Sequence, residues 1–331
     1  MSERTLRQAN DLIAAGLAPA EQRAALDQVA ARYATAIPPV FARLIADPGD
    51  PIGRQFIPDP SELILAAHES DDPIGDDALS PIKGIVHRYP DRALLKPTLA
   101  CPVYCRFCFR RAHVGPDGGV LSDAELDAAF DWLAGHPAIR EVILTGGDPL
   151  LLSDRRIGAL LERLGRLEHV QRLRIHTRIP LATPERVTDA LAALLDMPKP
   201  LFVVLHANHA REFTDAGIAA LDRLRRRGIP LLGQSVLLRG VNDHPEALRA
   251  LFGAMLAARV KPYYLHQLDP APGTARFAVP IAEGRALIAA LRGTLSGIGL
   301  PSYILDSATG KMVLEPSPVL TDRPAVLGAL A

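Results

Sequence analysis

From residue 92 onward the chain alternates short apolar runs with amphipathic helical segments, and this alternation constrains the fold most strongly. Helices such as 122–134 and 157–166 separate the apolar runs, and Ser122 with Glu125 forms a capping-box start for the first helix. Buried strands in such alternation form a parallel sheet with right-handed crossovers. About six repeats predict an α/β fold that curves into a partial (β/α)6 barrel. The predicted strands are 93–99, 141–145, 172–176, 201–206, 231–237, 263–267 and 302–305.

The region before this alternation has a different character. Residues 3–46 show helical periodicity, which Pro38-Pro39 and the Pro-Gly-rich stretch 47–51 interrupt. We therefore expect three parts: a helical and irregular N-terminal extension over 1–90, the barrel over 91–300, and a C-terminal strand segment over 301–331.

The composition argues against several classes of protein. In the 331-residue chain, 37 Lys and Arg balance 37 Asp and Glu, so no global attraction to nucleic acid or to an anionic membrane is expected. No uncharged apolar run reaches the roughly eighteen residues of a membrane span. The N-terminus does not resemble a secretory signal, and clustered thiols fit a reducing compartment. We expect a cytoplasmic protein with no nucleic-acid or membrane partner.

Three cysteines, which are the only ones in the chain, follow the first predicted strand as Cys101, Cys105 and Cys108. Three thiolates at this spacing can bind three irons of a four-iron cluster and leave the fourth iron open for a ligand. One alternative is a structural zinc site completed by a histidine such as His113, and another is three buried apolar cysteines. The iron–sulfur interpretation is favoured because no second two-ligand knuckle is present for zinc.

Further polar residues follow the later strands. Since the carboxyl ends of parallel strands meet at one mouth of a barrel, we expect these side chains to gather there. Glycines at a strand end let the backbone approach a ligand closely, and an aspartate beside them can accept a hydrogen bond from an ammonium group. The residues concerned are Gly146, Gly147, Asp148, His176, His206, Gln234 and Asp269.

The Cys-x3-Cys-x2-Cys loop, followed one strand later by Gly146-Gly147-Asp148, resembles the radical S-adenosylmethionine superfamily. The resemblance implies a [4Fe-4S] cluster on the three cysteines, whose open iron binds the methionine end of S-adenosyl-L-methionine and generates a hydrogen-abstracting radical. Gly146, Gly147 and Asp148 would then line the methionine end. His206 and Gln234 match positions near S-adenosylmethionine.

Five longer segments resemble the lysine 2,3-aminomutase family. They begin at His87-Arg-Tyr-Pro-Asp-Arg, Cys108-Phe-Arg-Arg, His206-Ala-Asn-His, Gly233-Gln-Ser-Val-Leu-Leu-Arg-Gly-Val-Asn-Asp and Pro262-Tyr-Tyr-Leu-His-Gln-Leu-Asp. The resemblance implies an isomerase that also uses pyridoxal 5′-phosphate, held as a Schiff base on a lysine. Its cofactors carry the chemistry and the protein positions them.

Individual residues match the family's cofactor and substrate positions. Lys311, which follows Gly310, occupies the position of the pyridoxal phosphate lysine, and the residues that would hold this cofactor are Arg88, Tyr89 and Arg92. Arg110 matches the residue for the substrate carboxylate. Asp269 and Asp306 match the positions that bind the distal ammonium group of lysine, and they would repel glutamate.

The resemblance therefore implies an L-lysine 2,3-aminomutase that acts on free lysine and takes electrons from a donor such as flavodoxin or ferredoxin. The Cys-Arg-Phe-Cys-Phe-Arg-Arg run and the short C-terminal segment resemble the branch that supplies β-lysine for elongation factor P. Alternatives are an aminomutase for arginine or glutamate, and a non-catalytic iron–sulfur or zinc-binding protein. The sequence leaves the oligomeric state open.

Overall fold

One sheet of nine strands organises the computed structural model, which describes residues 4–115 and 118–314. The spatial order of the strands follows the chain from β1 to β9. β2 to β8 pair in parallel, whereas β1 and β9 pair antiparallel with their single neighbours. The strands are β1 Ile85–Tyr89, β2 Arg92–Thr98, β3 Glu141–Gly146, β4 Arg172–Thr177, β5 Leu201–His206, β6 Leu231–Val236, β7 Lys261–His266, β8 Ser302–Ser307 and β9 Gly310–Val313.

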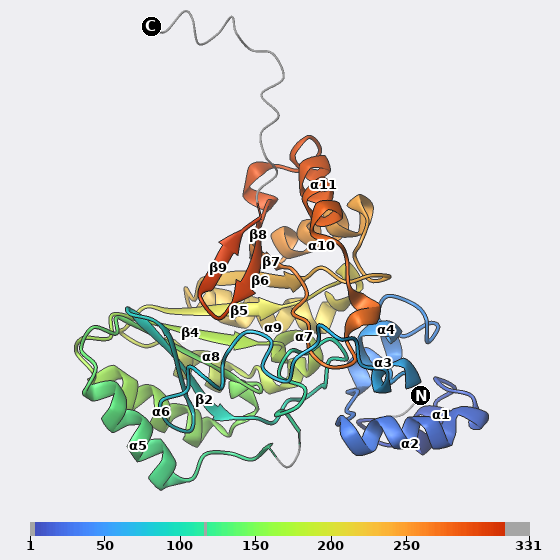
Figure 1. The fold of residues 1–331 in the computed structure, drawn as a ribbon. Coiled ribbons are helices and arrows are strands. Elements are labelled where there is room, and N and C mark those ends of the chain that lie inside the picture. The colour runs from blue at the N-terminus through green and yellow to red at the C-terminus, as the bar shows by residue number, and fades with distance from the viewer. Residues whose placement is uncertain (1–3, 116–117, 315–331) are drawn as a thin grey trace, which may run out of the picture.

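Helices fill every crossover between consecutive parallel strands from β2 to β8. Because each crossover moves one position in the same direction, the sheet curves and the helices cover its outer face (Figure 1). This arrangement confirms the predicted partial (β/α)6 barrel. The crossover helices are α5 Asp123–Ala134, α6 Asp154–Arg166, α7 Ile179–Ala182, α8 Asp189–Leu195, α9 Asp215–Arg226, α10 Pro245–Ala257 and α11 Ile281–Arg292.

Local sequence explains where these helices begin and which face they bury. Ser122 and Glu125 form the capping box expected at the start of α5. In α6 the buried positions Ile157, Leu160, Leu161 and Leu164 recur at the spacing of one helical face. Burying each such side chain contributes about 1.5–3 kcal/mol, so this face fixes the helix against the sheet.

The N-terminal segment packs against the loop that carries the cysteines. Its helices are α1 Ala9–Ala14, α2 Arg23–Arg32, α3 Pro39–Leu44 and α4 Gly53–Phe56, which lie together at one side of the barrel (Figure 1). The rings of Phe41 and Phe56 stack with their centroids 4.7 Å apart. The N–H of Arg106 donates to the carbonyl of Gln55 at 2.8 Å, so α4 holds the middle of the cysteine loop.

Two strands, β1 and β9, were not among the predicted strands. Each joins its neighbour through a short turn and pairs antiparallel, so the strand–helix alternation carries no sign of either. These two outer strands of the sheet contact each other, because the backbone N–H of Lys311 donates to the Tyr89 hydroxyl at 2.7 Å. The part of the expected C-terminal segment from residue 315 onward lies outside the described residues.

Within residues 4–115 and 118–314, none of the helices combines the length and the apolar composition needed to cross a membrane.

Candidate active site at the mouth of the barrel

The cysteine loop lies between β2 and α5, and its three thiols are free and partly buried. Burial raises the pKa of all three, that of Cys108 to about 11, so a positive partner is needed to hold them as thiolates. One such partner is present, because Arg178 Nη1 donates to Cys105 Sγ at 3.0 Å. These features suit a four-iron cluster, in which each cysteine binds a separate iron.

The alternative zinc site requires His113 and the cysteines to converge on one ion. Among the described residues, no three His, Cys, Asp or Glu side chains converge closely enough to hold a single metal ion. His113 instead lies beside a carboxylate, with its Nε2 3.4 Å from Asp77 Oδ2.

Gly146 and Gly147 let the end of β3 approach the residues that precede Cys101. Gly146 has a φ of +110°, and a Cβ on Gly147 would lie 2.2 Å from the carbonyl oxygen of Ala100. The close approach in this structure is thus between two backbones. Any side chain at Gly147 would displace the start of the cysteine loop.

Asp148 is buried, and its carboxylate is fully engaged by the protein. It accepts hydrogen bonds from the backbone N–H groups of Leu150, Arg178 and Ile179 and from the Thr177 hydroxyl, at 2.7–3.2 Å. Burial raises its pKa to about 6, although these hydrogen bonds oppose the shift. Asp148 therefore joins the ends of β3 and β4 beside the cysteine loop.

His206 and Gln234 lie opposite each other in the register of β5 and β6. The His206 ring stacks on Phe107 of the cysteine loop, with the centroids 5.8 Å apart and the planes 18° apart. The structure thus brings both residues that match S-adenosylmethionine positions to the mouth, and His206 next to the cysteines. Among the described residues, the buried side-chain atoms at these strand ends without a hydrogen-bond partner are His176 Nε2, Arg178 Nε, His206 Nε2, His266 Nε2 and Asp269 Oδ1.

Across the mouth, the ends of β7, β8 and β9 bring together Lys311, Asp306, His266 and Asp269. Lys311 Nζ lies 2.5 Å from Asp306 Oδ1, and His266 Nδ1 lies 2.9 Å from Asp306 Oδ2. Burial favours protonation of Asp306, but the hydrogen bond from His266 and the charge of Lys311 outweigh it and lower its pKa. Burial and the nearby Asp306 charge raise the pKa of Asp269 to about 7.

Asp76 links Arg88 and Arg110, which match family positions for two different ligands. Arg88 matches a pyridoxal phosphate position, and Arg110 matches the position for the substrate carboxylate. Its Oδ1 accepts from Arg88 Nη2 at 2.9 Å, and its Oδ2 accepts from Arg110 Nε and Nη2 at 2.9 and 2.6 Å. Arg92 stacks on the Tyr89 ring, 3.7 Å from its centroid. The sequence carries no signal for Asp76, because nothing distinguishes it from the other aspartates of the run 71–77.

Comparison with known proteins identifies the family. The model of the radical SAM superfamily matches residues 95–252. The L-lysine 2,3-aminomutase of Acetoanaerobium sticklandii is 38% identical over 292 residues, which cover 87% of this chain and 70% of the relative. The chain belongs to the lysine 2,3-aminomutase family. The glutamate 2,3-aminomutase of Clostridioides difficile is 34% identical over 287 residues, which cover 86% of this chain and 68% of that protein.

The protein is therefore a radical S-adenosylmethionine aminomutase, an isomerase of the lysine 2,3-aminomutase type. The fold agrees, because the structure of Streptococcus suis SuiB bound to S-adenosylmethionine superposes with a TM-score of 0.50 at 15% identity, over 66% of this chain and 51% of that chain. The three expected cofactors, the [4Fe-4S] cluster, S-adenosylmethionine and pyridoxal 5′-phosphate, are those that membership of these families implies.

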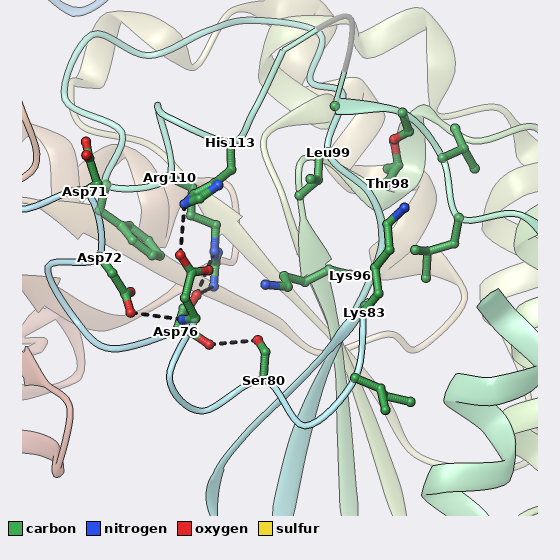
Figure 2. A pocket seen from close by; sticks show the side chains of 18 of the residues that line it. Asp71, Asp72, Asp76, Ser80, Lys83, Lys96, Thr98, Leu99, Arg110 and His113 are labelled. Atoms are coloured by element: carbon green, nitrogen blue, oxygen red, sulfur yellow. Dashed lines mark hydrogen bonds and ion pairs between the residues drawn. The ribbon is translucent and has the colours of Figure 1, made fainter.

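A cavity of about 450 Å³ opens beside Arg110. Figure 2 shows Arg110 and Asp76 on one wall and Lys96, which extends from β2, on another. Burial lowers the pKa of Lys96, and the neighbouring positive charge of Arg110 adds to the effect. Lys96 lies in the predicted strand 93–99 and was not among the predicted site residues. Alternate positions of a barrel strand face the interior, and this alternation is the signal that could have identified it.

A buried cluster of charges braces the cysteine loop from the outside. Glu62, which is fully buried, pairs with Arg106 at 2.5 Å, with Arg111 and with Arg276 at 3.2 Å. Arg106 and Arg111 belong to the cysteine loop, so this carboxylate holds the loop to the N-terminal segment. The arginines were visible in the cysteine motif, but their partner Glu62 carries no local signal in the sequence.

Proposed function

We propose that this family member is an L-lysine 2,3-aminomutase that converts free L-lysine to β-lysine. The observation that supports lysine is the carboxylate pair Asp269 and Asp306. Asp269 Oδ1 is buried without a hydrogen-bond partner, which is costly unless a bound ligand supplies one. The distal ammonium group of lysine has the charge and the donors to fill that role, and leaving the pair unoccupied would penalise uncharged substrates.

We propose Lys311 as the residue that binds pyridoxal phosphate, with Arg88, Tyr89 and Arg92 around the cofactor. Arg88 and Arg92 provide the planar donors that suit a phosphate, and Tyr89 is already hydrogen-bonded to the backbone of Lys311 at 2.7 Å. The cluster with S-adenosylmethionine supplies the hydrogen-abstracting radical, and pyridoxal phosphate supplies the group that carries the migrating nitrogen. Once Lys311 is committed to this cofactor, Asp306 loses its ammonium partner and becomes available to the substrate.

We propose that Arg110 binds the substrate carboxylate. Its guanidinium lines the cavity of Figure 2 and is oriented by Asp76 through two hydrogen bonds of 2.9 and 2.6 Å. A guanidinium fork held in this way suits a carboxylate. Arg110 and the Asp269/Asp306 pair thus recognise the two ends of a lysine molecule by opposite charges.

The same charges separate lysine from the alternative substrates. The side-chain carboxylate of glutamate would meet Asp269 and Asp306, and like charges in a dry site repel strongly. Arginine carries the right charge but a larger, planar head group. A substrate comparison therefore distinguishes all three amino acids.

We further propose that the enzyme works in the cytoplasm, takes its electron from a flavodoxin or ferredoxin, and supplies β-lysine for elongation factor P. The support for this branch is the Cys-Arg-Phe-Cys-Phe-Arg-Arg run of the cysteine loop. Mass measurement of elongation factor P before and after deletion of this enzyme tests the branch. An unchanged β-lysyl modification would contradict it.

The activity is tested with anaerobically reconstituted enzyme, S-adenosylmethionine, pyridoxal phosphate, a reductant and, in parallel, lysine, arginine or glutamate. We expect β-lysine as the main product. Asp269→Asn should abolish the preference for lysine, whereas Asp189→Asn, at a carboxylate whose side chain is 89% exposed, should leave it unchanged. Faster turnover of arginine or glutamate than of lysine would overturn the substrate proposal.

The cofactor lysine has its own test. Lys311→Ala should lose the absorbance of the bound pyridoxal phosphate together with activity. Lys199→Ala is the matched control, because Lys199 donates only to the carbonyls of Leu164 and Leu167, away from the mouth. An unchanged absorbance band in Lys311→Ala would remove Lys311 from this role.

A further inference from the structure

Arg178 lies directly after β4 and reaches across the mouth to the cysteine loop. Its side chain is 6% exposed, and its Nη1 donates to Cys105 Sγ at 3.0 Å. We propose that Arg178 is a positioning residue that orients Cys105 for the cluster and raises the reduction potential of that cluster.

The protein fixes the guanidinium in one orientation. Arg178 Nη2 donates to Gln55 Oε1 at 2.8 Å and to Glu212 Oε2 at 2.6 Å, and both partners are fully buried. The guanidinium carbon lies 4.8 Å from the centroid of the Phe56 ring and 5.9 Å from that of Phe107. Two acceptors on one side and aromatic rings around it leave Nη1 directed at the sulfur.

The backbone of Arg178 carries a second connection. Its N–H donates to Asp148 Oδ2 at 2.7 Å, and Asp148 follows the two glycines that approach the start of the cysteine loop. The position of the guanidinium is therefore set by the same turn that arranges the Gly146-Gly147-Asp148 segment. A shift of this turn would displace both Cys105 and the Gly146-Gly147-Asp148 segment, which is expected to line S-adenosylmethionine.

The electrostatic consequence follows from the burial. Reduction of a four-iron cluster adds one negative charge, and a fixed positive charge that donates a hydrogen bond to a ligand sulfur stabilises the reduced form. Water is excluded around the guanidinium, so its charge is weakly screened. Glu212 opposes the effect, because its carboxylate neutralises part of the charge of Arg178 at 2.6 Å.

This role of Arg178 depends on membership of the radical S-adenosylmethionine superfamily and on no particular substrate. The test is therefore a reduction potential, measured by electron paramagnetic resonance during anaerobic redox titration of the reconstituted enzyme. Iron and sulfide analysis of each preparation shows whether the cluster is present. Failure of the lysine assay would leave this measurement unaffected.

Arg178→Gln removes the charge and should shift the potential to more negative values. We expect the reduced-to-oxidised ratio at a fixed potential to fall on the order of tenfold, which corresponds to about 59 mV for a one-electron couple. Arg178→Lys keeps the positive charge but lacks the planar guanidinium, so its reduction potential should shift less. Glu212→Gln removes the carboxylate that offsets the charge of Arg178 and should shift the potential in the opposite direction.

Arg186→Gln is the matched control, because Arg186 pairs with Asp154 and the carbonyl of Leu152 away from the cysteines, and its potential should equal that of the unmodified enzyme. If Arg178→Gln takes up no cluster, Arg178→Lys and Glu212→Gln decide the question. Unshifted potentials in variants with full iron content, or shifts of the same sign in Arg178→Lys and Glu212→Gln, would overturn the proposal.

Discussion

The two sides of the barrel mouth treat their buried charges in opposite ways. On the cluster side, formed by the cysteine loop with Asp148 and Arg178, the Asp148 carboxylate accepts hydrogen bonds from four groups of the protein. On the lysine side, formed by β7 to β9 with Asp269 and Lys311, the Asp269 Oδ1 atom is buried without any partner. Both carboxylates have raised pKa values, about 6 and about 7.

The difference separates a structural carboxylate from one that awaits a ligand. Buried polar groups in folded proteins are hydrogen-bonded with few exceptions, and an exception calls for an explanation. On the cluster side the protein itself satisfies the Asp148 carboxylate, although the buried His206 Nε2 and Arg178 Nε atoms there have no hydrogen-bond partner. On the lysine side the unpartnered atom is a carboxylate oxygen, Asp269 Oδ1, which is the acceptor that we propose for the ammonium group of the substrate.

The largest expected effect comes from Asp148→Asn. The amide nitrogen would face backbone N–H groups, such as that of Arg178 at 2.7 Å, so buried donors would lose their acceptor. We expect the free energy of unfolding to fall by about 3 kcal/mol at pH 7, as judged by chemical denaturation. A loss below about 1 kcal/mol would show that the hydrogen bonds to Asp148 contribute little to the stability of the cluster side.

Asp269→Asn should raise the free energy of unfolding, in contrast to Asp148→Asn. The folded protein raises the pKa of Asp269 from 3.8 to about 7, so the native state holds a proton that the unfolded chain releases. Stability of the unliganded protein therefore falls as the pH rises between these values, and the full penalty is present above pH 7. The variant lacks this penalty, so its advantage in unfolding free energy over the unmodified protein should grow by roughly 2–3 kcal/mol between pH 5 and pH 8.

Denaturation curves of both proteins across this pH range measure that gain, and Asp189→Asn serves as the exposed control. The gain should come with a loss of lysine turnover, since the same carboxylate is proposed to bind the substrate. A variant that is less stable at pH 8 than the unmodified protein would place Asp269 with the structural carboxylates.

The smallest effect is expected at the contact between the outer strands. Tyr89→Phe removes the acceptor of the Lys311 N–H at 2.7 Å, which should cost about 1 kcal/mol of stability. Because Tyr89 also stacks under Arg92, at 3.7 Å, and phenylalanine keeps that ring, the stacking should remain. An effect as large as that of Asp148→Asn would mean that the lysine side is as tightly built as the cluster side.

The barrel was predictable from sequence, because the strand–helix alternation is a local pattern. The residues proposed for the cofactors and the substrate came from the cysteine and Gly-Gly-Asp motifs and from the family resemblance, and they stay predictions. The antiparallel strands β1 and β9 were not, since tight turns replace the helices that mark the other strands. Asp76, Arg178 and Glu62 were missed for a different reason. Each acts on a residue far away in the chain, as Glu62 does on Arg106, 44 positions later, and such pairing leaves no local pattern.

The contact that joins the first and last strands spans 222 positions, from Tyr89 to Lys311. During synthesis the cysteine loop, the Gly-Gly-Asp turn and the strands from β1 to β8 leave the ribosome before Lys311 does. The cluster side therefore has all its residues synthesised before Lys311. The three cysteines are thus synthesised well before Lys311, the residue that we propose to bind pyridoxal phosphate.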